Sequence, residues 1–250
     1  MKHLERKKYK RLGIHFLILI VFIAQTIITI GVSRSSSFSK SQYPIDYILD
    51  NYLFIALISN PILISSLVKK VIEIEEKNKM WQMQLILGEK VNTILLDKFK
   101  YLSMRLVLLQ VVEALVFLML ASRSDHFSLD LPILLRFCVV NLSALLINLF
   151  FLGLFMIIEM KSKKVYSLSF IAIIGGLTGV ITMLTSRVLS FINPFAWPSS
   201  LLTLSYIRKD DEFIQVQNPI NYYTGIIALT LLILSIIYLK NMKSYHLWKD

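Results

Sequence analysis

Six long apolar segments, separated by charged loops, constrain this 250-residue chain more than any other feature. A helix needs about 20 mostly apolar residues to cross the hydrocarbon core of a bilayer. Hydrophobic residues make up 56% of the chain and charged residues 17%, whereas soluble domains are about 45–50% apolar. We therefore expect one all-α integral membrane domain over residues 1–250, with six transmembrane helices. The segments are residues 13–32, 47–68, 104–121, 132–158, 166–188 and 222–239.

Lysine and arginine gather in alternate loops, which predicts how the helices are oriented. These residues number 20 in the loops and termini on one side of the expected membrane and six on the other, with Arg136 inside the fourth segment. Because loops rich in lysine and arginine stay in the cytoplasm, we expect both termini to be cytoplasmic. The net charge of +11 then fits contact with anionic lipid headgroups, so the expected partner is the lipid bilayer and not nucleic acid.

Two loops are longer than a simple connection requires, and the first is the cytoplasmic loop of residues 69–105. It contains no proline, and Met80, Met83, Ile86 and Leu87 recur at a spacing of three to four residues. This spacing is typical of a helix with one apolar face. We expect one or two amphipathic helices along the cytoplasmic face of the membrane after the second transmembrane helix.

The second long loop, residues 187–221, lies on the external side and precedes the sixth helix. Near its start two prolines bracket aromatic residues, and the apolar stretch from Leu201 to Ile207 follows. We expect a bent re-entrant segment that dips into the outer leaflet, since irregular backbone at that depth has to be buried against protein or face water. Its candidate residues are Asn193, Pro194, Phe195, Trp197 and Pro198.

The sequence lacks the common motifs for catalysis. There is no Gly-x-x-x-x-Gly-Lys-Ser/Thr phosphate loop and no His-Glu-x-x-His zinc motif. The four histidines are spread over both sides of the expected membrane, and Cys138 is the only cysteine. We expect no metal site, no cofactor bound to this chain and no enzymatic activity.

Several polar side chains fall inside the apolar segments. Gln110 and Glu113 lie one turn apart in the third segment, and Arg136, Asn141 and Asn148 lie along the fourth. Charged side chains within a membrane usually face the protein interior or a water path. The depths of Glu113 and Arg136 differ by roughly 6 Å, from a rise of about 1.5 Å per residue. Two interpretations stay open: a Glu113–Arg136 pair that locks helices 3 and 4, or a protonated Glu113 hydrogen-bonded to a neighbouring helix.

The fifth segment contains Gly175, Gly176 and Gly179, with Gly175 and Gly179 in a Gly-x-x-x-Gly spacing. This spacing allows two helices to approach closely. Packing within the chain and contact with a second subunit are both compatible with it.

One stretch resembles a known family. The residues from Ile72 to Gln82, with Leu95 to Phe99, look like the first cytoplasmic loop of type-2 ABC exporter permeases. In that family a glutamate follows helix 2, a short amphipathic helix comes next, and a lysine opens helix 3, a place that Lys98 or Lys100 fits. Asn193 to Pro198 more narrowly resembles the bacterial subgroup that protects against lantibiotics. Six helices, cytoplasmic termini and a re-entrant segment before helix 6 are also similar.

The resemblance implies a permease that works with a separate ABC ATPase subunit, which would bind the ATP and Mg²⁺. Six helices are half of a translocator, so a second permease copy or a paralogue would complete it. The alternative for the 73–79 stretch is a solvated helix face with pairs such as Glu73–Lys77. The residues expected to couple to the ATPase are Glu73, Glu75, Glu76, Lys77, Trp81 and Lys98.

The resemblance also suggests a substrate and a location. An amphipathic antimicrobial peptide of the lantibiotic type, expelled from a bacterial plasma membrane, needs a lateral apolar opening. Phe191, Phe195 and Trp197 would line that opening, or would anchor the protein at the lipid headgroups. The alternatives are export of another amphipathic substrate, such as a drug or a lipid, and a membrane scaffold or sensor subunit that transports nothing.

Overall fold

The computed structural model describes residues 13–77, 80–161, 167–209, 212–219 and 221–242. Among these residues, six helices are long and apolar enough to cross a membrane, which confirms the expected six spans by helix length and hydropathy. Two of them, α4 and α6, run well past the apolar segments expected at 47–68 and 104–121. Charged side chains end an apolar segment without ending a helix. The six are α2 (Ile14–Ser33), α4 (Pro44–Lys77), α6 (Val91–Ala121), α7 (Leu131–Lys161), α8 (Ser167–Thr185) and α11 (Tyr223–Asn241).

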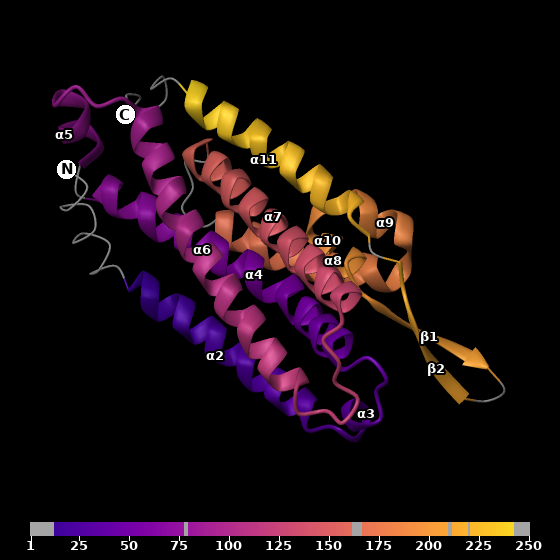
Figure 1. The fold of residues 1–250 in the computed structure, drawn as a ribbon. Coiled ribbons are helices and arrows are strands. Elements are labelled where there is room, and N and C mark those ends of the chain that lie inside the picture. Colours follow the sequence, from indigo (N-terminus) through magenta and orange to yellow (C-terminus); the bar gives the residue numbers. More distant parts are fainter. Residues whose placement is uncertain (1–12, 78–79, 162–166, 210–211, 220, 243–250) are drawn as a thin grey trace.

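The six helices lie side by side in one bundle (Figure 1). Helix α4 is central, because it packs against α2, α6, α7 and α8. One end of the bundle, named the α5 end, carries α5 (Met80–Ile86), the start of α2 and the last turn of α11. The opposite end, named the hairpin end, carries α3 (Ser36–Ser39) and a β-hairpin. That the α5 end faces the cytoplasm stays a prediction.

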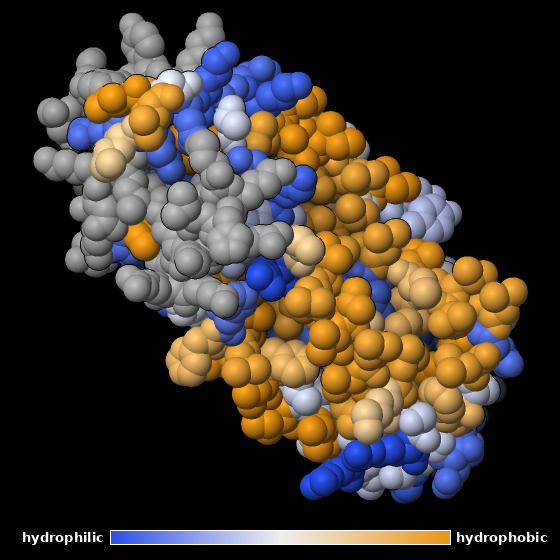
Figure 2. Space-filling model, turned by 60° about the vertical axis from the view of Figure 1, so that its left-hand side comes forward, coloured by the Kyte–Doolittle hydropathy of each residue, from blue (hydrophilic) through white to orange (hydrophobic). Residues whose placement is uncertain are grey.

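The surface of the bundle is apolar around its middle. Figure 2 shows hydrophobic residues across the centre of the molecule and hydrophilic residues gathered toward its two ends. Leu115 and Met119 on α6 and Phe170 on α8 are more than 60% exposed. Apolar side chains exposed in this number are unfavourable in water and favourable in lipid, so the surface agrees with a membrane-spanning bundle.

The β-hairpin corrects the expectation of an all-α fold. Strands β1 (Leu204–Lys209) and β2 (Glu212–Gln217) pair antiparallel, with Leu204 opposite Gln217 and Ile207 opposite Ile214. The stretch from Leu201 to Ile207, expected to dip into the membrane, instead leads into β1, and Ile207 is 54% exposed. In Figure 1 the hairpin extends beyond the helices at the hairpin end. Polar and apolar residues alternate only in part over Leu204-Ser205-Tyr206-Ile207. The sequence pattern therefore did not predict the strand.

The segment between α8 and the hairpin is bent, as expected, and folds against the bundle. This bent segment comprises α9 (Arg187–Ile192), the 3₁₀-helix η1 (Pro194–Ala196) and α10 (Trp197–Ser200). Glycines of α8 leave room for it: a Cβ on Gly175 would collide with the ring of Phe195, and a Cβ on Gly179 would lie 2.8 Å from the Phe195 carbonyl oxygen. The Gly-x-x-x-Gly spacing therefore serves packing within the chain.

Helices α7 and α11 pack through two matched pairs of small residues. A Cβ on Gly225 of α11 would lie 2.6 Å from the hydroxyl of Ser143 on α7. Ten residues further along both helices the roles reverse, since a Cβ on Gly153 of α7 would collide with the hydroxyl of Ser235 on α11. Small residues at such contacts let backbones approach closely. Because both pairs advance in the same direction, α7 and α11 run parallel.

Pro61 lies inside α4, one turn after the residues that α8 approaches, Leu57 and Ile58. A proline has no N–H, so the carbonyl of Leu57, four residues earlier, loses its partner within the helix. That carbonyl lies next to Gly176 of α8, where an added Cβ would be 3.6 Å from the oxygen and 3.3 Å from the Ile58 Cα. Glycine thus permits α8 to cover the irregular turn of α4.

Candidate functional site

Polar side chains from four helices meet in the middle of the bundle. Those on α4, α6 and α7 are joined by hydrogen bonds to one another or to α2. From the rise of about 1.5 Å per residue, they lie roughly 12–26 Å from the hairpin end of their helices. This group is named the interior polar cluster, and its members are Gln25, Tyr52, Ser59, Asn60, Gln110, Glu113, Asn141 and Asn148.

Glu113 is held by Tyr52, and the expected Glu113–Arg136 pair is wrong. The Tyr52 hydroxyl donates a hydrogen bond of 2.6 Å to Oε2 of Glu113, and both side chains are at most 2% exposed. The ring of Tyr52 packs against Phe117, with centroids 4.5 Å apart, which fixes the hydroxyl. The alternative, a hydrogen bond from Glu113 to a neighbouring helix, describes this contact. Its protonation stays a prediction.

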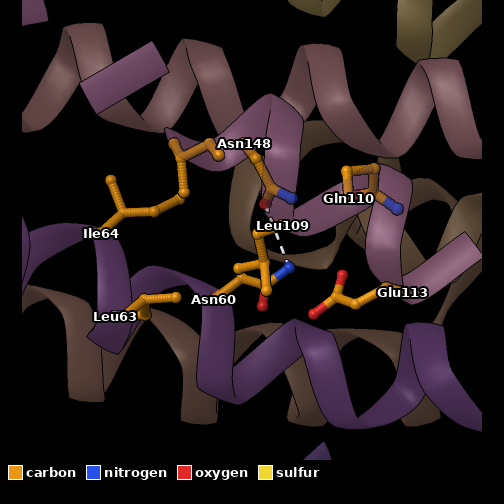
Figure 3. A pocket seen from close by; sticks show the side chains of 8 residues that line it. Asn60, Leu63, Ile64, Leu109, Gln110, Glu113 and Asn148 are labelled. Carbon is orange, nitrogen blue, oxygen red and sulfur yellow. Dashed lines mark hydrogen bonds between the residues drawn. The ribbon is translucent and has the colours of Figure 1, made fainter. Parts of the chain in front are cut away.

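The two asparagines of α7 each bind a different helix. Asn141 accepts a hydrogen bond of 3.1 Å from Nε2 of Gln110 on α6. Asn148 accepts one of 3.3 Å from Nδ2 of Asn60 on α4, which is the dashed line in Figure 3. Seven residues separate the asparagines, so they lie on the same face of α7. The polar line expected along this helix therefore joins it to both neighbours.

Helix α2 enters the cluster through Gln25. Its Nε2 donates to the Ser59 hydroxyl at 2.7 Å and to Oδ1 of Asn60 at 2.9 Å. Gln25 is 2% exposed. Of the six long helices α2 has the smallest buried share, and Gln25 joins it to α4.

A small cavity lies beside Glu113 (Figure 3). Its volume is about 10 Å³, close to the minimum of about 10–15 Å³ that one water molecule needs. Oε1 of Glu113 is buried and accepts no hydrogen bond from any residue that the structure describes. The lining is Asn60, Leu63, Ile64, Leu106, Leu109, Gln110, Glu113 and Asn148.

Arg136 belongs to a second polar site, at the hairpin end. Its Nε donates to Oδ1 of Asp46 at 3.2 Å, and its Nη2 donates to the carbonyl oxygen of Thr203 at 2.7 Å. Asp46 also accepts a hydrogen bond of 2.7 Å from Gln217 on β2. The segment expected at 47–68 left Asp46 outside the membrane, so it was not considered as a partner. In fact α4 begins at Pro44 and carries Asp46 in its first turn.

Asp50, one turn further along α4, holds the start of the hairpin. Its Oδ1 accepts from the backbone N–H and the hydroxyl of Thr203, at 2.7 and 2.8 Å. Its Oδ2 accepts from the N–H of Leu204 at 2.8 Å. Together with Asp46 and Arg136, it forms what is named here the hairpin anchor. A carboxylate that accepts several N–H and O–H bonds fixes the backbone that donates them.

The candidate residues of the bent segment are placed by packing and caps. The side chain of Asn193 accepts from the N–H of Phe195 at 3.1 Å and donates to the hydroxyl of Thr182 on α8 at 3.2 Å. Pro194 opens η1, where its missing N–H costs nothing. The ring of Phe195 lies 4.9 Å from that of Phe151.

Trp197 and Pro198 are buried, which excludes the two roles expected for Trp197. The indole is 5% exposed, packs 5.5 Å from the ring of Phe150 on α7 and donates to the Phe191 carbonyl oxygen at 2.8 Å. It therefore neither reaches the lipid headgroups nor lines an opening. Phe191 itself is 46% exposed and stays available for either role.

The residues expected to couple to an ATPase lie at the α5 end. Glu73, Glu75, Glu76 and Lys77 form the last turns of α4, and the side chains of the last three are outside the described residues. The next two expected residues are internal: Trp81 is 4% exposed and Lys98 0%, with Nζ of Lys98 5.8 Å from the centre of the indole ring. Neither offers a surface to a partner, which corrects their expected role.

Sequence reasoning missed Tyr52, Asn60 and Gln25, although their signal was present. Each is a polar residue within an apolar segment, the same feature that selected Gln110 and Asn141. Their shared burial and pairing are visible only in three dimensions.

Metal ligands and similarity to known proteins were the remaining guides to function. Among the described residues, no three histidine, cysteine, aspartate or glutamate side chains gather to hold a metal ion. The chain is a multi-span membrane protein by the length and hydropathy of its helices. Comparison with models of protein families, with curated proteins and with solved structures found no match.

Proposed function

We propose that this chain is the permease subunit of an ATP-driven exporter in a bacterial cell membrane, and that it expels amphipathic peptides of the lantibiotic type. ATP and Mg²⁺ would be bound by a separate ABC ATPase. The observation that carries the proposal is the helical elbow at the α5 end, where α4 continues to Lys77, α5 follows, and α6 begins at Val91.

The elbow is suited to contact a partner protein. Met83, Ile86 and Leu87 are 62%, 81% and 77% exposed, and they form an apolar ridge beyond the transmembrane part of α4. Buried Trp81, packed under Lys98, fastens the same short helix to α6. A ridge that is exposed on one side and fastened on the other transmits the movement of a bound partner to α4 and α6 as rigid bodies.

The small size of the interior cavity supports a substrate pathway outside the bundle. The cavity beside Glu113 has a volume of about 10 Å³, which is far too small for a peptide. A substrate would therefore pass along the surface of the bundle, between this chain and a second permease copy or paralogue. The apolar outer surface (Figure 2) suits an amphipathic substrate taken from the lipid.

The test is to place a photo-crosslinking amino acid at Ile86 in the full chain, expressed in its native membrane. We expect crosslinks from Ile86 to a protein with a phosphate loop. The control is the same probe at Met119, which is also exposed, at 67%, but lies near the other end of α6; it should give no such crosslink. If the ATPase no longer copurifies with the Ile86→Glu variant, although that variant is still inserted in the membrane, the result would support the elbow as the docking site.

A sensitivity panel tests the substrate. Cells with this chain and an ATPase of intact phosphate loop should resist lantibiotics better than cells lacking either protein. Resistance only to drugs or lipids would move the proposal to another amphipathic substrate. Absence of any ATPase crosslink in intact membranes would refute the exporter and favour a scaffold or sensor subunit.

A further inference from the structure

Glu113 is the acidic residue of the interior polar cluster, and one of its carboxyl oxygens is unused. Tyr52 donates to Oε2, whereas Oε1 is buried and accepts no hydrogen bond from the described residues. Figure 3 shows the carboxyl group pointing into the space beside Asn60 and Gln110. An acid placed this way in a membrane protein, with one oxygen bound and one directed at a water-sized cavity, needs a physical account.

Among the residues that the structure describes, no cationic side chain of the neighbouring helices pairs with this carboxyl group. Helices α2, α4, α7 and α11 pack against α6, and the titratable side chain that contacts Glu113 from them is Tyr52. On α6 itself, Arg105 is eight residues away, roughly 12 Å along the helix. It lies over the ring of Tyr101, further toward the α5 end.

The remaining charged groups of these helices lie further away or serve other contacts. Asp46 and Asp50 of α4 and Arg136 of α7 form the hairpin anchor. By their positions within the helix bounds, the other described cationic side chains on the five helices lie nearer the α5 end: His15, Lys69, Lys70, Lys98, Lys100, Lys161 and Lys240.

A carboxylate in this place would carry an uncompensated charge, which is unfavourable in an apolar interior. Binding a proton removes that cost. The bond from Tyr52 works in the opposite direction, because a donor to a carboxylate favours the ionised form. The cavity supplies a position for the water molecule through which a proton would arrive or leave. The geometry therefore permits both the neutral and the ionised state of the acid.

We propose that Glu113, Tyr52 and the adjoining cavity form a proton-binding site within the bundle. Glu113 holds a proton on Oε1 in the closed arrangement described here, and releases it to water when α4, α6 and α7 separate enough to hydrate the cavity. Release leaves a carboxylate that accepts the hydrogen bond from Tyr52. The proposal concerns this chain alone and holds whether or not the chain is an exporter.

A metal cation fits the same cavity less well than a proton. Four of its lining side chains are apolar: Leu63, Ile64, Leu106 and Leu109. The amide oxygens of Asn60 and Asn148 already accept hydrogen bonds. A bound metal ion needs several free oxygen ligands, whereas a proton needs one, and Oε1 is that one.

The experiment is infrared spectroscopy of the purified full chain in lipid nanodiscs over a series of pH values. The spectrum of Glu113→Gln is subtracted, so that the part of the difference that changes with pH reports this carboxyl group. Glutamine keeps an oxygen to accept from Tyr52 and preserves the shape of the side chain. We expect a carboxylic acid band at neutral pH, sensitive to deuterium, which gives way to carboxylate bands as the pH rises.

Tyr52→Phe is the second variant. It removes the donor that favours the carboxylate, so the acid band should persist to a pH higher by about one to two units, the size expected for one hydrogen bond to a charged group. Ser59→Ala, which removes a cluster hydroxyl with no contact to Glu113, is the matched control and should leave the transition in place.

Three results would overturn the proposal. Carboxylate bands at neutral and mildly acidic pH would show that Glu113 stays ionised. An acid band that survives strongly alkaline pH in the folded protein would show a permanently neutral structural group. Conversion to carboxylate on adding sodium chloride at fixed pH, but not potassium chloride, would identify a sodium site instead.

Discussion

Gly179 of α8 should be intolerant of even one added methyl group. A Cβ there would lie 2.8 Å from the carbonyl oxygen of Phe195, 3.0 Å from its carbonyl carbon and 3.0 Å from Cδ2 of Leu57. Optimal separations between such atoms are about 3.5–4.0 Å. Two of the three atoms belong to the backbone of η1, which cannot rotate out of the way. The bent segment would have to move as a whole.

The size of the effect follows from comparison with a second glycine. Gly31 of α2 has no described atom within 4 Å of an added Cβ. An alanine in place of a helical glycine gains about 1 kcal/mol, and this gain applies equally to Gly179→Ala and Gly31→Ala. The difference between the two variants is therefore the overpacking itself, about 1–3 kcal/mol. We expect the upper half of that range, since backbone atoms are involved.

The assay is reversible unfolding in mixed micelles with increasing SDS, followed by tryptophan fluorescence. Trp197 lies in the bent segment and reports on its displacement. Gly175→Ala adds a further comparison, because the three atoms nearest to its Cβ all belong to the ring of Phe195; Phe195→Leu should restore its stability but not that of Gly179→Ala. If Gly179→Ala proves as stable as Gly31→Ala, the close approach of α8 and η1 is wrong.

Three more predictions concern the polar contacts. Arg136→Gln should destabilise the fold by about 3 kcal/mol, because Asp46 loses a buried partner; a double-mutant cycle with Asp46→Asn should show coupling, and additivity would contradict it. Asp50→Ala leaves the backbone N–H groups of Thr203 and Leu204 without their acceptor, which at about 1–3 kcal/mol should speed their amide hydrogen exchange at least several-fold; unchanged exchange would speak against the anchor. Lys98→Met should expose α5 to limited proteolysis, whereas Lys100→Met, at an exposed position, should not; equal cleavage would argue against the packing on the indole.

The number and type of the long helices could be predicted because the bilayer sets a minimum apolar length. The residues at which these helices begin and end could not be predicted in the same way. The expected start of the third helix at residue 104 misses the part of α6 from Val91, since Asp97, Lys98 and Lys100 interrupt the apolar pattern. Helix continuity depends on backbone hydrogen bonds and not on apolarity, so charged turns extend a helix beyond the membrane.

The members of the polar sites were partly predictable, but their partners were not. Gln110, Glu113 and Asn141 were selected as polar residues in apolar segments, and the structure places them in one cluster. Arg136 was paired with Glu113 from depth along the helix axis alone. Rotation about the axis and contact with the hairpin decide the pairing, and both depend on how α4 and α7 face each other.

The two glycine–serine pairs between α7 and α11 have a consequence for motion. Ser143 fits against Gly225 and Ser235 against Gly153, so a shift of one helix along the other would drive both hydroxyls into bulkier neighbours at once. The two pairs together oppose sliding of α7 along α11. Helices α7 and α11 should move as one rigid body, and any conformational change should occur at the contacts of this pair with the other helices.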